Sequence, residues 1–141
     1  MIMKNKLRSI LLIDDDEPTN FLNRRLLEGM HCAEKVQVIQ KAAEALEYLK
    51  KVTEQESEDV PFPDIIFLDI NMPAMDGWEF LEAFREIINK RNKKARLIML
   101  TTSINPEDEQ KAKESEVVTA FRNKPLSSDM VREILKRHDA A

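Results

Sequence analysis

The 141-residue sequence contains one cysteine and no long apolar run, and both absences limit what the protein can be. Cys32 alone can form neither an intrachain disulfide nor a thiol-rich metal site. The longest clean apolar runs, such as 10–13 and 65–68, are far shorter than the roughly 18 residues that a membrane-spanning helix requires. The basic, polar N-terminus also lacks the apolar core of a secretory signal. We therefore expect a cytoplasmic protein that is not inserted in a membrane.

The sequence has no excess of basic residues: 22 lysines and arginines face 26 aspartates and glutamates, which gives a net charge of −4. The isoelectric point is about 5.3. The chain as a whole therefore lacks the electrostatic footprint of a nucleic-acid-binding protein. One basic cluster, from Lys90 to Arg96, fits the C-terminal end of a helix followed by a solvated loop. Apolar residues make up 43% of the chain and charged residues 34%, which is typical of a globular domain with one core. No direct nucleic-acid partner is expected.

Short apolar runs alternate with segments of helical periodicity along the chain. The apolar runs are typical of strands that helices cover on both faces, as in a parallel sheet. The predicted strands are 10–13, 36–39, 65–68, 97–100 and 117–121, and the predicted helices include 18–28, 42–49, 81–88, a segment opened by Pro106, and 131–135. This alternation predicts an α/β fold with a doubly wound parallel sheet. The acidic segment 53–63 is long for a connection, and we interpret it as a solvated loop.

Acidic and polar side chains follow four of the predicted strands, at the ends where doubly wound sheets bind their ligands. They are Asp14, Asp15 and Asp16 after the first strand, Asp69 and Asn71 after the third, Thr101, Thr102 and Ser103 after the fourth, and Lys124 after the fifth. Clustered carboxylates need a cation, and oxygen ligands suit Mg²⁺. An aspartate can form an acyl phosphate, while a lysine, a hydroxyl and a metal can stabilise the transferring phosphoryl group. The pattern predicts magnesium-dependent phosphoryl transfer onto a carboxylate.

Four segments resemble the receiver domain of two-component response regulators. They are Leu-Leu-Ile-Asp-Asp-Asp-Glu at 11–17, Phe-Leu-Asp-Ile-Asn-Met-Pro-Ala-Met-Asp-Gly at 67–77, Met-Leu-Thr-Thr-Ser at 99–103, and Asn-Lys-Pro at 123–125. The resemblance implies a flavodoxin-like fold with five helices and a five-stranded parallel sheet of order 2-1-3-4-5. It also implies an N-terminal tail over 1–8, a receiver domain over 9–138, no output domain, and a bacterial source. The 53–63 segment and the triplet at 101–103 resemble single-domain receivers that partner phytochrome-type kinases.

The resemblance also implies a role for each residue of the site. The implied phospho-acceptor is Asp69, the metal ligands are Asp15, Asp14 through water, Asp69 and the Asn71 carbonyl, the phosphoryl-binding groups are Thr101 and Lys124, and the switch residues are Thr101 and Phe121. The implied Lys124–Pro125 peptide bond is cis. The chain departs from the family pattern in several places. Phe121 replaces a frequent tyrosine, Thr102 replaces a smaller residue, Glu116-Val117-Val118 lacks the usual glycine, and Asn71 and Ser103 occupy positions that tune dephosphorylation.

The implied function is that of a signalling phospho-acceptor rather than an enzyme acting on other substrates. The expected donor is a sensor histidine kinase or a histidine phosphotransfer protein, and the output passes to a downstream protein target. The face formed by the fourth helix, fifth strand and fifth helix is the expected surface for partners or for a homodimer. A haloacid-dehalogenase-type phosphatase fits poorly, because Pro18 stands where that motif needs threonine or valine. The alternative that stays open is a receiver-like interaction scaffold that is never phosphorylated.

Overall fold

The computed structural model describes residues 6–55, 60–72, 74–91, 95–102 and 104–140, without the side chains of 137–140. Residues 1–5 of the predicted tail and 56–59 of the predicted loop lie outside this range, as does Ser103. None of the described helices is long and apolar enough to cross a membrane.

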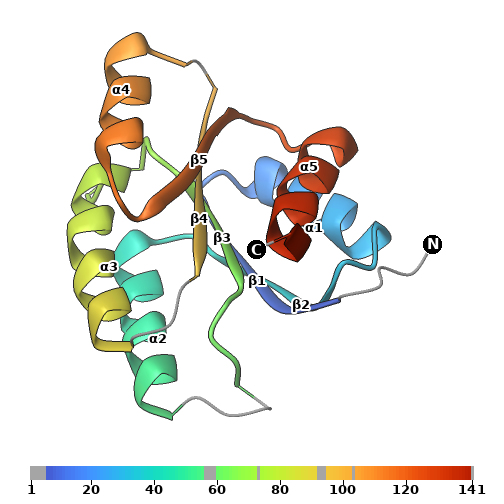
Figure 1. Ribbon diagram of the computed structural model, residues 1–141, viewed down its shortest axis with the longest axis horizontal. Coiled ribbons are helices and arrows are strands. Elements are labelled where there is room, and N and C mark those ends of the chain that lie inside the picture. The colour runs from blue at the N-terminus through green and yellow to red at the C-terminus, as the bar shows by residue number, and fades with distance from the viewer. Residues whose placement is uncertain (1–5, 56–59, 73, 92–94, 103, 141) are drawn as a thin grey trace.

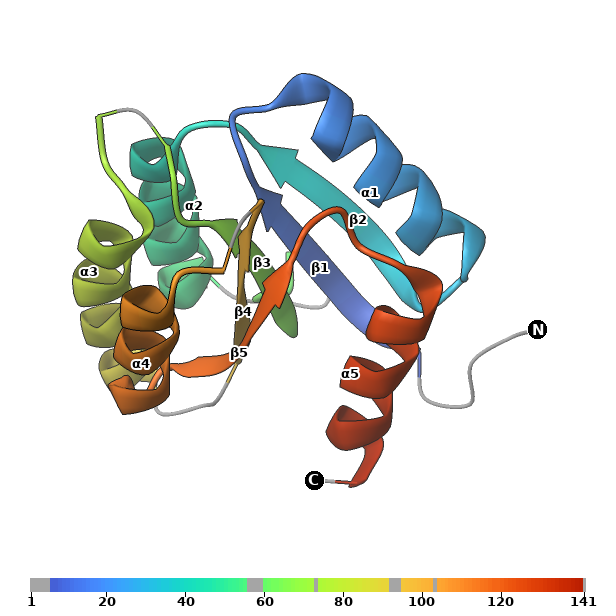
Figure 2. The ribbon, with the colours of Figure 1, turned by 90° about the horizontal axis from the view of Figure 1, so that it is seen from above.

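Five parallel strands form one sheet, as the sequence predicts. The strands are β1 (Leu7–Ile13), β2 (Ala33–Ile39), β3 (Ile65–Asp69), β4 (Arg96–Thr101) and β5 (Val118–Asn123). Their order is β2-β1-β3-β4-β5, so all the carboxyl ends lie at one edge of the sheet (Figures 1 and 2). Every residue of β3, the central strand, is buried, which explains its unbroken apolar run before Asp69. The predicted fold class and strand order are therefore confirmed.

Two helix layers cover the sheet (Figure 1). One layer contains α1 (Glu17–Gly29) and α5 (Ser128–Ala140), and the other contains α2 (Ala42–Gln55), α3 (Gly77–Arg91) and α4 (Pro106–Glu114). Alternate residues of the inner strands divide between two apolar cores; on β1, for example, Leu11 packs with α2 and α3, whereas Leu12 packs with α1 and α5. Phe80 and Phe84, on the buried face of α3, stack against each other in the core, as expected of packing residues.

Polar residues in the loops before α1, α3, α4 and α5 cap the N-termini of these helices. The side chain of Asp16 caps α1 by accepting a hydrogen bond from the Thr19 amide, and Asn105 caps α4. Asp76 accepts hydrogen bonds from the first amides of α3, and the Ser127 hydroxyl accepts one from α5. These bonds satisfy amide groups that a helix leaves unpaired at its N-terminus. The caps fix where these four helices begin, each after a strand whose end carries a residue of the candidate site.

The prediction of a solvated loop over 53–63 holds for the exposed Val60 but is wrong at both ends of the segment. Residues 53–55 continue α2, and 61–63 are buried. The Phe62 side chain is only 3% exposed, and the Arg91 guanidinium lies 4.1 Å from the centre of its ring. The apolar residue within an acidic sequence therefore closes the core below α2 and α3. The edge strand β2 also begins earlier than its apolar run, because Glu34 and Lys35 face solvent while their backbone pairs with β1.

Gly77 fits the turn into α3 because no larger residue has room there. A Cβ atom at Gly77 would lie 2.8 Å from the Cα of Ile70 and 3.0 Å from the Met99 side chain. The Gly77 amide also donates a hydrogen bond to the Ile70 carbonyl. The close approach holds the start of α3 against the end of β3, one residue after Asp69.

Candidate functional site

Three carboxylates converge at the carboxyl end of the sheet. Asp14 and Asp15 follow β1, and Asp69 is the last residue of the neighbouring strand β3. One oxygen of each carboxylate lies within 4.8 Å of the others. Asp14 and Asp69 are 4% and 3% exposed, whereas Asp15 lies in solvent. Two carboxylates are therefore fixed in the protein, and a third is accessible at the mouth of the site.

Lys124 lies between the two buried carboxylates. Its Nζ donates a hydrogen bond to Asp14 Oδ2 at 3.0 Å and lies 3.3 Å from Asp69 Oδ1. Its backbone amide donates to the Thr101 carbonyl at 2.8 Å, which ties the end of β5 to the end of β4. The Lys124–Pro125 peptide bond is cis, as predicted. The ammonium offsets the mutual repulsion of Asp14 and Asp69.

The electrostatics of this cluster shift two pKa values. Burial raises the pKa of Asp69, and the charge of Asp14 raises it further, against the opposing effect of Lys124. Burial alone lowers the pKa of Lys124, but its hydrogen bond to Asp14 and the charges of Asp14 and Asp69 outweigh burial and raise it. The lysine therefore stays charged at neutral pH. Its charge is not enough to cancel the effects of burial and of Asp14 on the pKa of Asp69.

The oxygen atoms of this cluster suit a hard divalent cation. Three carboxylates with one ammonium leave excess negative charge, and both buried acids present oxygen atoms toward the exposed Asp15. Mg²⁺ accepts such oxygen ligands and keeps several waters, for which the open side at Asp15 leaves access. Asn71 lies two residues beyond Asp69, and its amide donates to Asp69 Oδ1 at 3.3 Å. The residues present therefore fit a magnesium site.

The remaining predicted site residues lie on β4, its loop and β5. Thr101 is 1% exposed at the end of β4, and Thr102, which follows it, is exposed. Phe121 on β5 is 8% exposed and packs in the core between the sheet and α3 and α4. Ser103 lies outside the described residues. The structure thus brings the ends of β1, β3, β4 and β5 together as the sequence predicts.

Two residues that bond to the backbone at Asp14 and just beyond Lys124 were not predicted from the sequence. Asn20 and Asn23 lie on the buried face of α1, together with Leu27. Asn20 Nδ2 donates to the Asp14 carbonyl, and Asn23 Oδ1 accepts from the Leu126 amide. Their spacing of three and then four residues to Leu27 is the helical period of a buried face. Asparagines at two positions of a helix face that is otherwise expected to be apolar could have indicated a buried polar contact.

Comparison with known proteins identifies the family. The family model described as the response regulator receiver domain matches residues 10–136. The chain belongs to the receiver-domain family. Sporulation initiation phosphotransferase F of Bacillus subtilis is 31% identical over 129 residues, covering 92% of this chain and 91% of that protein. The hybrid signal transduction histidine kinase D of Dictyostelium discoideum is 33% identical over 108 residues, covering 75% of this chain but only 6% of the kinase.

Solved structures agree with the assignment of this receiver. A two-component response regulator from Cytophaga hutchinsonii superimposes with a TM-score of 0.87 at 30% identity, covering 96% of this chain and 99% of that one. The receiver domain of the Arabidopsis thaliana histidine kinase CKI1, complexed with Mg²⁺ and BeF₃⁻, gives 0.76 at 25% identity, covering 94% and 92%. The bacteriophytochrome response regulator AtBRR gives 0.74 at 28% identity, covering 93% and 91%. The relatives include eukaryotic proteins, so the family itself does not imply a bacterial source.

Proposed function

We propose that this receiver accepts a phosphoryl group on Asp69 and passes the signal to a protein partner. The observation that supports this most directly is the buried arrangement of Asp14, Lys124 and Asp69, with Asp15 open to solvent beside it. A structural ion pair needs one acid and one base, whereas this site holds three carboxylates and one lysine, two acids more than the lysine can neutralise. This excess negative charge favours a bound metal cation, and the cation together with Lys124 would in turn favour the anionic phosphoryl group.

In the proposed reaction, a carboxylate oxygen of Asp69 bonds to the phosphorus of a phosphohistidine. The phosphorus–nitrogen bond breaks, its electron pair stays on the imidazole nitrogen, and Asp69 becomes an acyl phosphate. In this proposal the Lys124 ammonium, which lies 3.3 Å from Asp69, and the Thr101 hydroxyl at the end of β4 hold the phosphoryl oxygens. Asp15, Asp69 and the Asn71 carbonyl, with Asp14 through water, would hold a magnesium ion, which would supply further positive charge to those oxygens. The protein acts on its own side chain, as a signalling phospho-acceptor.

The rim of the site suits a protein donor. Among the described residues, the large exposed apolar side chains are Phe21, Leu22, Val60 and Ile104. Phe21 and Leu22 lie in the first part of α1, which begins just after Asp15, and Ile104 follows the end of β4. Apolar groups beside a charged pocket favour a macromolecular donor that covers them, such as a sensor histidine kinase or a histidine phosphotransfer protein. The similarity to AtBRR makes a phytochrome-type kinase one candidate.

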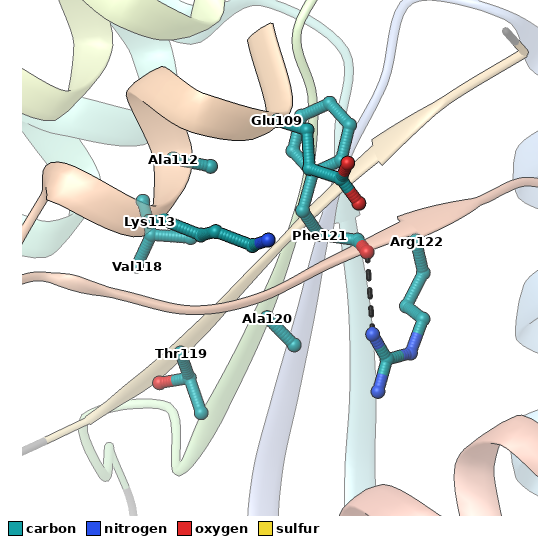
Figure 3. A pocket seen from close by; sticks show the side chains of 8 residues that line it. All are labelled: Glu109, Ala112, Lys113, Val118, Thr119, Ala120, Phe121 and Arg122. Carbon is teal, nitrogen blue, oxygen red and sulfur yellow. Dashed lines mark hydrogen bonds between the residues drawn. The ribbon is translucent and has the colours of Figure 1, made fainter. Parts of the chain in front are cut away.

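The proposed output surface includes a groove between α4 and β5 (Figure 3). The groove has a volume of about 190 Å³ and is lined by Glu109, Ala112 and Lys113 of α4 and by 118–122 of β5, including Phe121. α4 contributes one buried residue, Ala112, so little apolar packing holds this helix in place. Inward movement of Thr101 toward the phosphoryl group would change the surroundings of Phe121, and with them the groove. A downstream protein or a second copy of the chain would then bind the changed groove with a different affinity.

The test is incubation with acetyl phosphate and Mg²⁺, followed by intact-mass measurement. We expect one phosphoryl adduct in the wild type that requires Mg²⁺ and is absent from Asp69→Asn. Asp16→Asn is the matched control, because Asp16 is an exposed helix cap next to the site and its variant should still form the adduct. If neither acetyl phosphate nor a phosphohistidine donor labels the wild type, the proposal fails and the unphosphorylated scaffold replaces it.

A further inference from the structure

Two asparagines lie on the buried face of α1, in a layer otherwise made of apolar side chains. Asn20 is 4% exposed and Asn23 is 2% exposed. Residues three apart on a helix are neighbours on one face, so both side chains point in the same direction. Burying an amide is unfavourable unless its groups are hydrogen-bonded. The partners of these two side chains therefore show what they do.

Asn20 holds the backbone of Asp14. Its Nδ2 donates to the Asp14 carbonyl oxygen at 2.7 Å, while Asp14 Oδ1 accepts from the Asp16 amide at 2.9 Å and Oδ2 from Lys124 at 3.0 Å. All three oxygens of Asp14 are thereby held. Within the described part of the chain, Asn20 Oδ1 is buried without a hydrogen-bond partner. A leucine would fill the same space without burying that oxygen, so packing alone does not account for the asparagine.

Asn23 holds the chain just beyond Lys124. Its Oδ1 accepts a hydrogen bond at 3.1 Å from the amide of Leu126, two residues after the lysine. The Leu126 side chain is itself buried in the layer formed with α1 and α5. In Figure 2 the connection from β5 to α5 turns toward α1, where this bond forms. The same helix face therefore contacts the chain at both Asp14 and Leu126.

These contacts matter because Asp14 and Lys124 come from strands that are not neighbours. Two strands, β3 and β4, separate β1 from β5, which corresponds to roughly 14 Å between their backbones. Strand pairing alone does not fix the position of the lysine relative to Asp14. The bond from the Lys124 amide to Thr101 fixes one side of the connection, and the bond from Leu126 to Asn23 fixes the other.

We propose that Asn20 and Asn23 are positioning residues for phosphoryl transfer, each for a different part of the site. Asn20 orients Asp14 and thereby the acidic ligands of the metal. Asn23 holds the segment that carries Lys124 and thereby the placement of its ammonium on the phosphoryl group. The inference rests on the proposed phosphorylation of Asp69, and it predicts separate effects on metal binding and on the rate of transfer.

The experiment uses the full chain with Asn20→Leu, Asn23→Leu and a control, Val131→Ala, which removes buried volume from α5 in the same layer. Calorimetric titration with Mg²⁺ gives the dissociation constant, and acetyl phosphate at saturating Mg²⁺ gives the phosphorylation rate. We expect Asn20→Leu to weaken Mg²⁺ binding about 10-fold, in the range seen when a partner of a metal ligand is lost. We expect Asn23→Leu to slow phosphorylation about 10- to 100-fold while leaving Mg²⁺ binding close to wild type.

Further variants separate positioning from stability. Asn23→Asp retains an acceptor for the Leu126 amide and should recover much of the rate, and hydrogen exchange at that amide should be slow in Asn23→Asp and fast in Asn23→Leu. Asn20→Ala replaces Asn20→Leu if the leucine variant does not fold. Effects on both constants that match those of Val131→Ala would overturn the proposal, as would no effect on either. If neither acetyl phosphate nor a phosphohistidine donor phosphorylates the wild type, the proposed function fails, whereas Mg²⁺ affinity and hydrogen exchange at Leu126 still decide whether the asparagines position the site.

Discussion

Replacing Lys124 with methionine should strongly destabilise the receiver in the absence of Mg²⁺. The side chains of Lys124, Asp14 and Asp69 are 10%, 6% and 4% exposed, so solvent screens them little. At an effective dielectric constant of about 20, contacts at 3.0 and 3.3 Å correspond to roughly 5 kcal/mol of attraction each, before desolvation is subtracted. Methionine keeps most of the apolar stem of the side chain but leaves two buried carboxylates without their cation.

The expected net loss is about 3–5 kcal/mol, which is typical when one partner of a buried ion pair is removed. For a chain of this size, the loss lowers Tm by roughly 6–20 °C. Urea denaturation at pH 7 with a chelator measures the free energy of unfolding. Arg24→Met is the matched control, because Arg24 and Glu28 form a pair that is more than half exposed, and its loss should cost at most about 0.5 kcal/mol.

Two further measurements test the cause of this destabilisation. Saturating Mg²⁺ should narrow the gap between wild type and Lys124→Met, because the ion replaces part of the lost charge. Asp69→Asn should reduce the cost of Lys124→Met by about 1 kcal/mol or more, since one of the two carboxylates is then neutral. If the free energy of unfolding of Lys124→Met without Mg²⁺ lies within about 1 kcal/mol of the wild-type value, the reasoning about the buried charges is wrong.

Three other predictions follow from the same structure. Burial raises the pKa of Asp69, so the stability contributed by its protonated form is present below its ordinary pKa of 3.8 and is lost as pH rises through the raised value. Because Asp69→Asn stays neutral, its free energy of unfolding in urea without Mg²⁺ should exceed that of wild type by an amount that grows from about pH 4 to pH 7. A difference that shrinks over this range would contradict the raised pKa of Asp69. Gly77→Ala should cost about 1–3 kcal/mol in the same assay because its Cβ meets Ile70, whereas Gly29→Ala, with no atom within 4 Å, should stabilise by about 0.5–1 kcal/mol; equal effects would refute the steric argument. Asp76→Ala should cost about 1 kcal/mol through loss of the α3 cap, and an unchanged unfolding midpoint would show that the cap is dispensable.

Much of the fold and the site could be predicted from the order of local patterns. Strands buried on both faces need unbroken apolar runs, and the polar residues after those runs must meet at one edge of a parallel sheet. The positions of Asp14, Asp69, Thr101 and Lys124 follow from this rule alone. Helix caps such as Asp16 are also local, because a cap bonds to amides only a few residues away.

Features that depend on distant contacts were harder to predict. The burial of Phe62 could not be read from its acidic, proline-containing segment, because the Arg91 side chain that contacts it comes from the end of α3. Likewise, the start of β2 extends beyond its apolar residues, since pairing with β1 orders the backbone of an exposed edge whatever its side chains are.

Local sequence patterns were enough to predict which chemical groups the receiver has and at which edge of the sheet they gather. How those groups are held depends on contacts that form only in the folded chain. The contact of Lys124 with Asp14 spans two intervening strands. From α1, Asn20 bonds to the Asp14 carbonyl and Asn23 to the amide of Leu126, two residues after Lys124. Local patterns report on neighbours along the chain, whereas these contacts join residues that folding brings together from both ends of it.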